Sequence, residues 1–463
     1  MNLNRKNILV VGLGMTGLAT ARFLHHRGAV VTVTDTASEK DLLTSVQELR
    51  QLGIRTELGA HCRESVALSD MIVLSPGVPH TLGFLADARR KGIPVIGEIE
   101  LASRFVTDPI IAITGTNGKT TTTSLLGDML VQCGMQVFVG GNIGNPLIGY
   151  VDREEKADWI VLEISSFQLD TIETFRADIG MLLNITADHL DRYADIDGYA
   201  ASKGRIFKNQ TLEDIAIFNG ADSWVLSQTS RIHSRKWMFN GSNALEEGAR
   251  IGQTDVTFDF TSSPYRRQAS GADARLAFTS AHLDLRQSRL YGKHNRENIC
   301  AAAMAAIAAG GDIRNIQLAL NQFKGLSHRI EFVHIHNGVT YVDDSKATNV
   351  DAVYRALDAF HEPVVLIMGG RDKGGDYRIL ENVIQEHVKH LILLGEAGGL
   401  IAEALGNLVP TERVDSMHEA VKLAHHVAVS GDVVLLSPAC SSFDMFNDYA
   451  HRGKVFHSEV KKL

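Results

Sequence analysis

The chain lacks several features that would place it in other classes of protein. Only four of its 463 residues are cysteines, widely spaced and without a Cys-x-x-Cys pair, so we expect buried thiols in a reducing compartment. The formal net charge of −8 argues against a broad nucleic-acid-binding face. No apolar run approaches the roughly 20 residues of a membrane span, and the N-terminus is typical of a strand rather than a signal peptide. We therefore expect a cytoplasmic protein that binds no nucleic acid and has no membrane span.

The composition that is present is typical of a large folded protein. Hydrophobic residues make up 44% of the chain and charged residues 22%, which predicts a well-filled core. Short β-branched runs alternate with longer helical stretches, so the expected fold class is α/β with parallel sheets. The length suggests about three domains, and we place them at residues 1–107, 108–325 and 326–463.

Apolar runs between helical stretches predict the strands. Residues 241–290 are polar and alternating, which favours antiparallel hairpins, with a surface loop at 262–275. Because ligands in open α/β sheets lie at the carboxyl ends of strands, the residues that follow each run are the candidates for chemistry. The predicted strands are Ile8–Val11, Val30–Thr34, Met71–Leu74, Trp159–Ile164, Ile179–Leu183, Ile215–Phe218, Val339–Val342, Val364–Met368, Leu391–Leu394 and Val433–Leu436.

The stretch at residues 112–121, AITGTNGKTT, has the order of a phosphate-binding loop. An apolar run precedes it and a helical segment, Thr120–Val131, follows it. Gly115 and Gly118 allow backbone N–H groups to approach phosphate oxygens, and the start of the helix presents further N–H groups. In this pattern Lys119 meets the β- and γ-phosphates and the Thr120 hydroxyl binds Mg²⁺.

This loop is shorter than the general pattern G-x-x-x-x-G-K-[ST]. The residue five positions before Gly118 is Ile113, not glycine. From these residues alone, the segment Gly118–Thr120 could also be an ordinary start of a helix.

A second glycine-rich loop lies near the N-terminus. Gly12, Gly14 and Gly17 have the spacing of a dinucleotide-binding fingerprint, and Asp35 ends the next predicted strand. The ligand could be a nicotinamide cofactor or a nucleotide-linked sugar, and a tight turn without a ligand is a further alternative. Two such loops in consecutive domains suggest a nucleotide-bearing substrate together with a nucleoside triphosphate.

Polar residues that follow the central strands could complete a metal site. Glu163 ends the strand at 159–164, and a carboxylate beside a phosphate loop is a natural ligand of Mg²⁺. His189 follows the strand at 179–183 among acidic residues, which marks it among the 19 histidines. Lys203, by sequence alone, is expected to be a solvated helix lysine.

Asn295 and Asn298 precede a long alanine-rich helix. Their spacing places them on one helix face, and amides can recognise an adenine edge as donor and acceptor. Capping of the helix is an equally good explanation of either asparagine.

Together these segments resemble the Mur ligase family of ATP-dependent enzymes that form amide bonds. Folylpolyglutamate synthases share the phosphate loop and the central domain, but not the Gly12–Gly17 domain or the segment at 437–446. The resemblance covers the whole chain in order and includes the family's shortened loop, G-T-N-G-K-[ST]. It is carried by Thr114–Thr121, Gly141–Gly144, Glu163–Leu169, Asn184–His189, His294–Asn298, Asp344–Asn349, Ser437–Phe446 and the pair Arg452-Gly453.

The resemblance implies three domains and a role for each matching residue. The first domain would be Rossmann-like, the second a P-loop ATPase-type α/β domain with extra antiparallel strands, and the third Rossmann-like. Lys119, His189 and Lys203 would be the catalytic residues. The magnesium ligands would be Thr120, Glu163, His189 and Lys203, the lysine as a carbamate formed with CO₂, which supplies oxygen ligands where a free ammonium would be repelled. The ATP site would comprise Gly115, Thr116, Asn117, Gly118, Lys119, Thr120, Thr121, Asn295, Asn298, Arg329 and Asp344.

The resemblance also implies the reaction and its partners. The segment Ser437–Phe446 is similar to that of members that add D-glutamate to UDP-N-acetylmuramoyl-L-alanine through an acyl phosphate, in peptidoglycan precursor synthesis. ATP and two Mg²⁺ ions would take part, ADP and phosphate would leave, and we expect a monomer. The UDP-linked substrate would contact Gly14, Met15, Thr16, Asp35, Thr36, Ser75 and Asn142. D-glutamate would lie among Lys346, Thr348, Lys373, Ser442 and Tyr449.

Three positions depart from the family pattern. Ala37 stands where some relatives have arginine, so the uracil end of the substrate would be held differently. Ser327 stands where proline is common, and Tyr449 where phenylalanine is common. None of these positions touches the phosphate chemistry.

Three other functions are alternatives to this one. A nicotinamide-dependent oxidoreductase accounts only for Gly12–Gly17 and Asp35 and leaves the second loop unexplained. A nucleotide-binding regulator without turnover would have the same fold. A sibling ligase would add L-alanine, a diamino acid or a dipeptide, and the segment Ser437–Phe446 argues against it.

Overall fold

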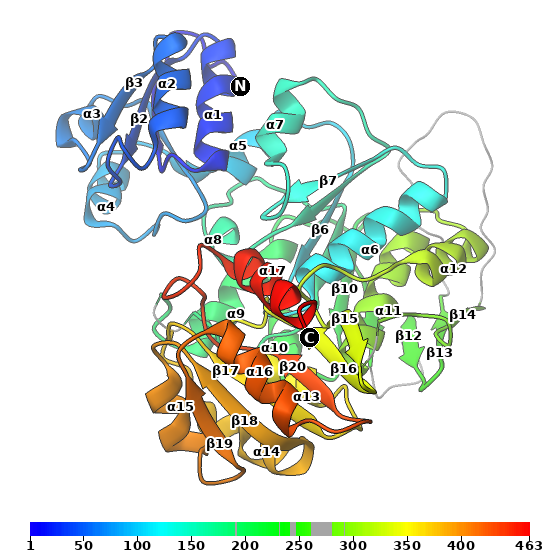
Figure 1. Ribbon diagram of the computed structural model, residues 1–463. Coiled ribbons are helices and arrows are strands. Elements are labelled where there is room, and N and C mark those ends of the chain that lie inside the picture. Colours follow the sequence, from blue (N-terminus) through cyan, green and yellow to red (C-terminus); the bar gives the residue numbers. More distant parts are fainter. Residues whose placement is uncertain (190–191, 231, 241–246, 261–279, 291) are drawn as a thin grey trace. The chain divides into compact units, whose positions relative to one another are not determined.

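The structure is a computed structural model that describes residues 1–463 except 190–191, 231, 241–246, 261–279 and 291 (Figure 1). The chain forms two compact units, each built from several segments. The first comprises Met1–Ile185, Arg192–Gln287 and Asn298–Asn321. The second comprises Thr186–Asp191, Ser288–Glu297 and Gln322–Leu463.

The N-terminal part of the first unit is a five-stranded parallel sheet in the order β3-β2-β1-β4-β5. Alternate side chains of its strands face two apolar layers, one with α1, α2 and α5 and the other with α3 and α4. The order reverses between β1 and β4, which is where ligands bind in sheets of this kind. The elements are β1 (Asn7–Val11), α1 (Met15–His26), β2 (Val30–Asp35), α2 (Leu43–Gln51), β3 (Arg55–Leu58), α3 (Arg63–Ala67), β4 (Met71–Leu74), α4 (Gly83–Arg90), β5 (Val95–Gly97) and α5 (Glu98–Ser103).

The rest of the first unit contains a nine-stranded sheet in the order β14-β13-β12-β11-β10-β9-β6-β8-β7. Its strands are parallel from β7 to β12, and β12, β13 and β14 pair antiparallel. The strands are β6 (Ile110–Thr114), β7 (Val137–Gly141), β8 (Trp159–Glu163), β9 (Ile179–Leu182), β10 (Ile215–Asn219), β11 (Arg235–Phe239), β12 (Gly248–Ile251), β13 (Asp255–Asp259) and β14 (Ser280–Asp284). The helices are α6 (Lys119–Gln132), α7 (Leu147–Asp152), α8 (Ser166–Leu169), α9 (Ile196–Gly204), the 3₁₀ turn Arg205–Phe207, α10 (Ser223–Gln228), α11 (Lys293–Ala308) and α12 (Ile313–Gln322).

The second unit is built on a six-stranded sheet in the order β15-β16-β20-β17-β18-β19, with only β15 antiparallel. One face packs on α13, α14 and α15, and the other on α16 and α17. The elements are β15 (Glu331–His336), β16 (Val339–Asp343), α13 (Val350–Leu357), β17 (Val364–Gly369), the 3₁₀ helix Tyr377–Leu380, α14 (Glu381–His387), β18 (Val388–Leu394), α15 (Gly398–Leu405), β19 (Thr411–Val414), α16 (Met417–Val427), β20 (Val433–Leu436) and α17 (Tyr449–Val460).

The α/β fold class predicted from the sequence is confirmed. Each predicted strand is present, with ends that differ by a few residues, and the predicted antiparallel hairpins are β12 to β14. The surface loop expected at 262–275 lies outside the described residues. Cys300 and Cys440 are buried as expected, whereas Cys62 and Cys133 are only partly buried.

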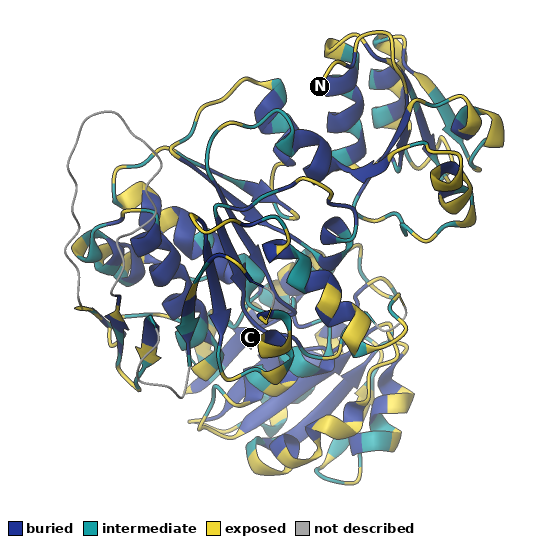
Figure 2. Ribbon diagram, turned by 180° about the vertical axis from the view of Figure 1, so that it is seen from behind, coloured by how far each residue is buried: buried dark blue, intermediate teal, exposed yellow. Residues whose placement is uncertain are grey.

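Figure 2 shows where the core lies: the inner strands of the sheets are buried along most of their length, whereas edge strands such as β3, β15 and β19 are partly exposed. Among the described residues, no helix is both long enough and apolar enough to cross a membrane.

Candidate active site

The loop between β6 and α6 has the conformation that its glycines allow. Gly115 has φ +158° and Gly118, the residue before α6, has φ +82°, a left-handed conformation that favours glycine. The Nζ of Lys119 donates hydrogen bonds of 2.8 Å to the carbonyl oxygens of both Gly115 and Thr116. The loop is therefore wrapped around its own lysine, and Thr120 and Thr121 follow in the first turn of the helix.

Asn184 fastens this loop to the end of β9. Its side-chain oxygen accepts from the N–H of Asn117 at 2.8 Å, and its side-chain amide donates to the carbonyl of Asn117. Its own carbonyl accepts from the N–H of Thr116 at 2.9 Å. The sequence motif includes Asn184 but does not by itself predict this role. The feature that indicates it is the position of an asparagine directly after a strand that neighbours the loop.

Asn298 lies directly against the loop. A Cβ placed on Gly118 would be 2.2 Å from the Oδ1 of Asn298, and the hydroxyl of Thr122 lies 3.4 Å from the same oxygen. Helix α11 begins at Lys293, so neither Asn295 nor Asn298 caps it, and the capping explanation is wrong. Both asparagines are buried.

Glu163 stands at the end of β8, paired in register with Ile113 of β6. It is only 2% exposed, and its Oε1 accepts from the Nδ2 of Asn142 at 2.9 Å. Its Oε2 is buried and has no hydrogen-bond partner among the described residues. A buried carboxylate oxygen without a donor is suited to a hard cation such as Mg²⁺.

Lys203 is not the solvated lysine that its helix position suggested. It lies near the end of α9 and is 1% exposed, with its Nζ donating to the carbonyl of Gly115 at 2.8 Å. The same Nζ lies 4.5 Å from the centre of the Tyr199 ring. The structure therefore brings Lys119 and Lys203 to one carbonyl of the phosphate loop.

His189 belongs to the second unit, whereas Thr120, Glu163 and Lys203 belong to the first. Its backbone has φ +56°, and its N–H donates to the Oδ1 of Asp188 at 2.9 Å. The other oxygen of Asp188 accepts from the Nδ2 of Asn349 at 3.1 Å. His189 is thus held by a carboxylate that is itself fixed to the start of α13.

The N-terminal glycine loop lies at the reversal point of its sheet. Gly12 has φ +95°, and a Cβ on Gly17 would be 1.9 Å from the carbonyl oxygen of Gly12, so α1 packs closely on the loop. Ser75, after β4, donates its hydroxyl to that same carbonyl at 2.8 Å. The two carboxylate oxygens of Asp35 accept from the N–H groups of Leu13 and Ala37. Asp35 therefore fixes the backbone of the glycine loop.

The other residues expected at this loop differ in exposure. Gly14 precedes α1, Met15 is 67% exposed, and Thr16 follows it in the first turn of α1. Thr36 is also exposed, as is Asn142, which follows β7 in the nine-stranded sheet. Met15 and Thr36 are therefore accessible to a ligand at the carboxyl end of the N-terminal sheet, and Asn142 is accessible at the carboxyl end of β7.

In the second unit, Asp344 lies directly after β16 and is buried. Its Oδ2 accepts from the hydroxyl of Ser437 at 2.9 Å, and its Oδ1 from the N–H of Ile330 at 3.3 Å. Burial raises the pKa of Asp344 to about 7, and the nearby charge of Arg329 opposes that rise. Arg329 and Asp344 are therefore close enough for their charges to interact.

Lys346 and Tyr449 also come together. The Nζ of Lys346 lies 3.6 Å from the centre of the Tyr449 ring, a cation–π contact. Ser345 donates its hydroxyl to the carbonyl of Tyr449 at 2.8 Å, which joins the first turn of α17 to the loop after β16.

Arg452 holds several loops of the second unit together. The sequence motif includes this residue but does not predict that role. It is buried, and it donates to the hydroxyl and carbonyl of Ser345 and to the carbonyls of Gly369 and Cys440. Burial lowers the pKa of this guanidinium to about 10. One side chain thus ties together the loops that follow β16, β17 and β20.

The remaining residues expected to bind an amino acid lie on those same loops. Thr348 is half-buried after β16, Lys373 is exposed after β17, and Ser442 is buried after β20. Because β20 lies between β16 and β17, the three loops are neighbours at the carboxyl edge of the sheet.

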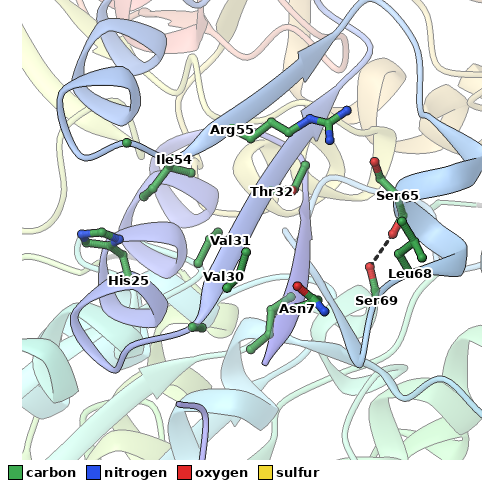
Figure 3. Close-up of a pocket in the computed structure, with 13 residues that line it drawn as sticks. Asn7, His25, Val30, Val31, Thr32, Ile54, Arg55, Ser65, Leu68 and Ser69 are labelled. Atoms are coloured by element: carbon green, nitrogen blue, oxygen red, sulfur yellow. Dashed lines mark hydrogen bonds between the residues drawn. The ribbon is translucent and has the colours of Figure 1, made fainter. Parts of the chain in front are cut away.

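A cavity of about 440 Å³ lies elsewhere, at the amino ends of the N-terminal strands (Figure 3). Asn7, Val30 and Arg55, the first residues of β1, β2 and β3, line it. This is the edge opposite to the glycine loop, Asp35 and Ser75. The cavity is therefore separate from the candidate site.

The sequence matches three domain families, which identify the class of protein. Residues 6–97 match the Mur ligase MurD-like N-terminal domain, 113–306 the Mur ligase middle domain, and 328–440 the Mur ligase glutamate ligase domain. The chain belongs to the Mur ligase family.

Its relatives point to one member of that family. A protein of Desulfosudis oleivorans named UDP-N-acetylmuramoylalanine–D-glutamate ligase is 53% identical over 99% of this chain and 97% of its own length. A protein of the same name from Desulfatibacillum aliphaticivorans is 49% identical over the full length of both chains. Among solved structures, a pseudomurein peptide ligase type C from Methanothermus fervidus is similar to this chain with a TM-score of 0.62 and 19% sequence identity. The match covers 99% of this chain and 100% of the other chain, and it shows a similarity of fold.

Proposed function

We propose that the protein joins D-glutamate to UDP-N-acetylmuramoyl-L-alanine and converts ATP to ADP and phosphate in peptidoglycan precursor synthesis. The observation that carries this proposal is the 53% identity, over nearly the whole chain, with a relative of that name. The geometry of the phosphate loop supports the ATP-dependent part, and the three loops joined by Arg452 support a site for an amino acid.

ATP would lie on the loop between β6 and α6. Its phosphate oxygens would take the place of the carbonyls that Lys119 now contacts, and the N–H groups at the start of α6 would face the same oxygens. Asn298, which lies against Gly118, would be near the nucleotide, and Asn295, Arg329 and Asp344 would complete its site.

Magnesium would be held by Thr120, Glu163, His189 and Lys203. The buried, unbonded Oε2 of Glu163 fits such a cation. Lys203 is buried beside Gly115, and a carbamate there would supply oxygen ligands where a free ammonium would repel the cation. We propose two ions, which when bound would neutralise charge on the transferring phosphoryl group. The test of metal binding is isothermal titration calorimetry with Mg²⁺ and an ATP analogue, in Glu163→Gln and in the unchanged protein.

The substrates would be distributed over the three parts of the chain. We propose residues 1–107 for the UDP moiety, 108–325 for ATP and 326–463 for D-glutamate. Asn142, hydrogen-bonded to Glu163, would hold the muramoyl end near the ATP site. Lys346 and Tyr449, with Thr348, Lys373 and Ser442, would surround D-glutamate.

The reaction would proceed in two steps. The terminal carboxylate of UDP-N-acetylmuramoyl-L-alanine attacks the γ-phosphorus of ATP, and the bond to ADP breaks to leave an acyl phosphate. The amine of D-glutamate then attacks the acyl carbon, and phosphate leaves. Lys119 and the backbone N–H groups would stabilise charge in the first step, and His189 would help to hold the tetrahedral intermediate of the second.

The decisive experiment is a phosphate-release assay. Purified protein would be given ATP, Mg²⁺ and UDP-N-acetylmuramoyl-L-alanine with each of a panel of amino acids, including both enantiomers of glutamate. Phosphate release is expected only with D-glutamate and only when every substrate is present. Equal release with L-glutamate, with L-alanine or without the UDP substrate would refute the assignment.

We propose further that the protein acts as a cytoplasmic monomer. Its nucleotide-linked substrates are expected in the cytoplasm, and each unit of the chain has its own core. Light scattering on the purified protein should give the mass of one chain.

A further inference from the structure

The second unit contains a group of four side chains that the proposed reaction does not use. They are His328, just before β15; Glu331, its first residue; Asp343, the last residue of β16; and His457, on α17. Each offers one metal-binding atom, and the four atoms lie within 4.8 Å of one another. Residues from three elements of the fold therefore converge on one point.

The distances within the group are short. The Oδ2 of Asp343 lies 2.6 Å from the Nδ1 of His328 and 2.9 Å from the Nε2 of His457. The Oε2 of Glu331 lies 3.9 Å from that same Nε2. Although it is near both carboxylates, the Nε2 of His457 is buried and makes no hydrogen bond of good geometry with any described residue. A ring nitrogen in this position can donate its lone pair to a cation.

The charge of the group also favours a cation. Asp343 is fully buried, and a buried carboxylate is stable only when its charge is compensated. Among the described residues, the ion-pair partners of Asp343 and Glu331 are the two histidines. Asp343 also accepts from the N–H of Ser345, and the charge of the buried Arg452 acts on it. A bound cation would add to this compensation and would use the lone pairs of both imidazoles.

We propose that His328, Glu331, Asp343 and His457 bind a divalent cation of the zinc class. Two imidazole nitrogens with two carboxylate oxygens suit Zn²⁺, whereas Mg²⁺ prefers an all-oxygen site. Ligands about 2.0–2.2 Å from a tetrahedral zinc lie about 3.3–3.6 Å apart. The observed separations of 2.6, 2.9 and 3.9 Å lie on both sides of that range, so small side-chain shifts would suffice. Glu331 and His457 have side chains 31% and 22% exposed, which provides a path for entry.

The site would fasten α17 to the hairpin of β15 and β16. Gly453 lets the helix come close, because a Cβ there would be 2.1 Å from the Nδ1 of His328 and 2.5 Å from the Oδ2 of Asp343. Tyr449 and Arg452 lie on the same helix, eight and five residues before His457. A bound cation would therefore stabilise the helix that carries both residues.

The test is metal uptake by the full chain, after treatment with a chelator and in buffer without Mg²⁺. Bound Zn²⁺ would be measured by equilibrium dialysis, and Co²⁺ would be used as a spectroscopic probe whose visible bands report tetrahedral coordination. We expect the unchanged protein to bind one more tight Zn²⁺ than His457→Gln or Glu331→Gln. Both positions are partly exposed, so these variants are expected to fold.

His451→Gln is the matched control, since His451 lies on the same helix, is exposed and is outside the group. It should keep the extra Zn²⁺, the tetrahedral Co²⁺ bands and a rise in melting temperature on addition of Zn²⁺. Equal uptake by the unchanged protein and by His457→Gln would overturn the proposal, because binding would then be at other histidines. Absence of tight Zn²⁺ from the unchanged protein would overturn it as well.

Discussion

Lys203 shows how the surroundings of one residue decide its chemistry. A lysine in a polar helix is ordinarily solvated, yet this one is buried beside Gly115 and the ring of Tyr199. A free ammonium would repel a magnesium ion bound beside it, whereas a carbamate would supply the oxygen ligands that Mg²⁺ prefers. The proposed carbamate therefore has a physical reason at this position.

Replacing Lys203 by alanine should abolish most activity, because the carbamate oxygens would be lost from the metal site. A short carboxylate such as formate should restore part of the rate by occupying the space left free. Steady-state phosphate release, with and without formate, is the measurement. Lys208→Ala, at an exposed lysine five residues further on, is the control and should be fully active. Full activity of Lys203→Ala would show that no carbamate is needed.

Lys119→Ala should lower kcat by at least about 10²–10³-fold, since one charged donor to the transferring phosphoryl group would be removed. The fold should persist, because Lys119 lies in the first turn of α6 and its hydrogen bonds to Gly115 and Thr116 are local to the loop. Phosphate release and circular dichroism would be measured together, with exposed Lys156→Ala as control. Near-normal turnover of Lys119→Ala would contradict the proposed ATP site.

The two lysines also show what sequence can predict at this scale. Lys119 was identifiable because its role follows from a contiguous pattern of glycines, lysine and threonine. The burial of Lys203 and the hydrogen bonds of Asn184 to the loop depend on how β6, β9 and α9 pack together. The local sequence around either residue does not predict this packing. Asp35 was expected to face a nucleotide, but its two oxygens also hold the backbone of the glycine loop.

At the scale of elements, Arg452 connects α17 with the ends of three strands. Its guanidinium makes hydrogen bonds to Ser345, Gly369 and Cys440, all of them buried. The geometry of the proposed D-glutamate site thus depends on a residue that need not touch the substrate.

Arg452→Ala should lower the free energy of unfolding by about 3 kcal/mol, because it would leave several buried carbonyls without donors. It should also raise the KM for D-glutamate more than that for ATP, as the three loops lose their common tie. Urea unfolding and steady-state kinetics would measure the two effects. Arg378→Ala, at an exposed arginine of the same unit, should change neither. An equal change in both KM values would argue against a positioning role.

Sequence periodicity predicted buried strands better than edge strands. The apolar runs of β1, β4, β17 and β20 were evident because both faces of each strand are buried. β7 contains two glycines, and β15 is largely exposed at the edge of its sheet, so neither has a strong apolar pattern. Their places in the sheets follow from pairing with β8 and β16.

At the scale of the whole molecule, Glu98 links the N-terminal sheet to the central one within the first unit. It begins α5, is buried, and accepts from the N–H of Ile148 in α7 at 2.7 Å. Its Oε2 has no partner among the described residues. Burial raises the pKa of Glu98 to about 7, and its hydrogen bonds to α7 only partly oppose that rise.

The stability of the first unit should therefore depend on pH through Glu98. The folded form holds the proton up to about pH 7, whereas the unfolded chain releases it near 4.5. The contribution to stability is present below pH 4.5 and is lost as pH rises through 7, a difference of about 3 kcal/mol. Urea unfolding of the unchanged protein and of Glu98→Gln, between pH 5 and 8, would measure it. A constant difference between the two proteins across this range would contradict the prediction.

The two compact units interleave along the chain, which crosses from one to the other five times, once inside α11 and once at the last residue of α12. No single cut separates them, because the stretches at 186–191 and 288–297 would stay attached to the wrong fragment. Recombination at one junction with a gene for a sibling enzyme would therefore exchange only part of the second unit. The resulting protein would combine segments of that unit from two different enzymes. Evolution of new amino-acid specificity in this architecture is thus expected to proceed by point substitutions or by co-transfer of those short stretches.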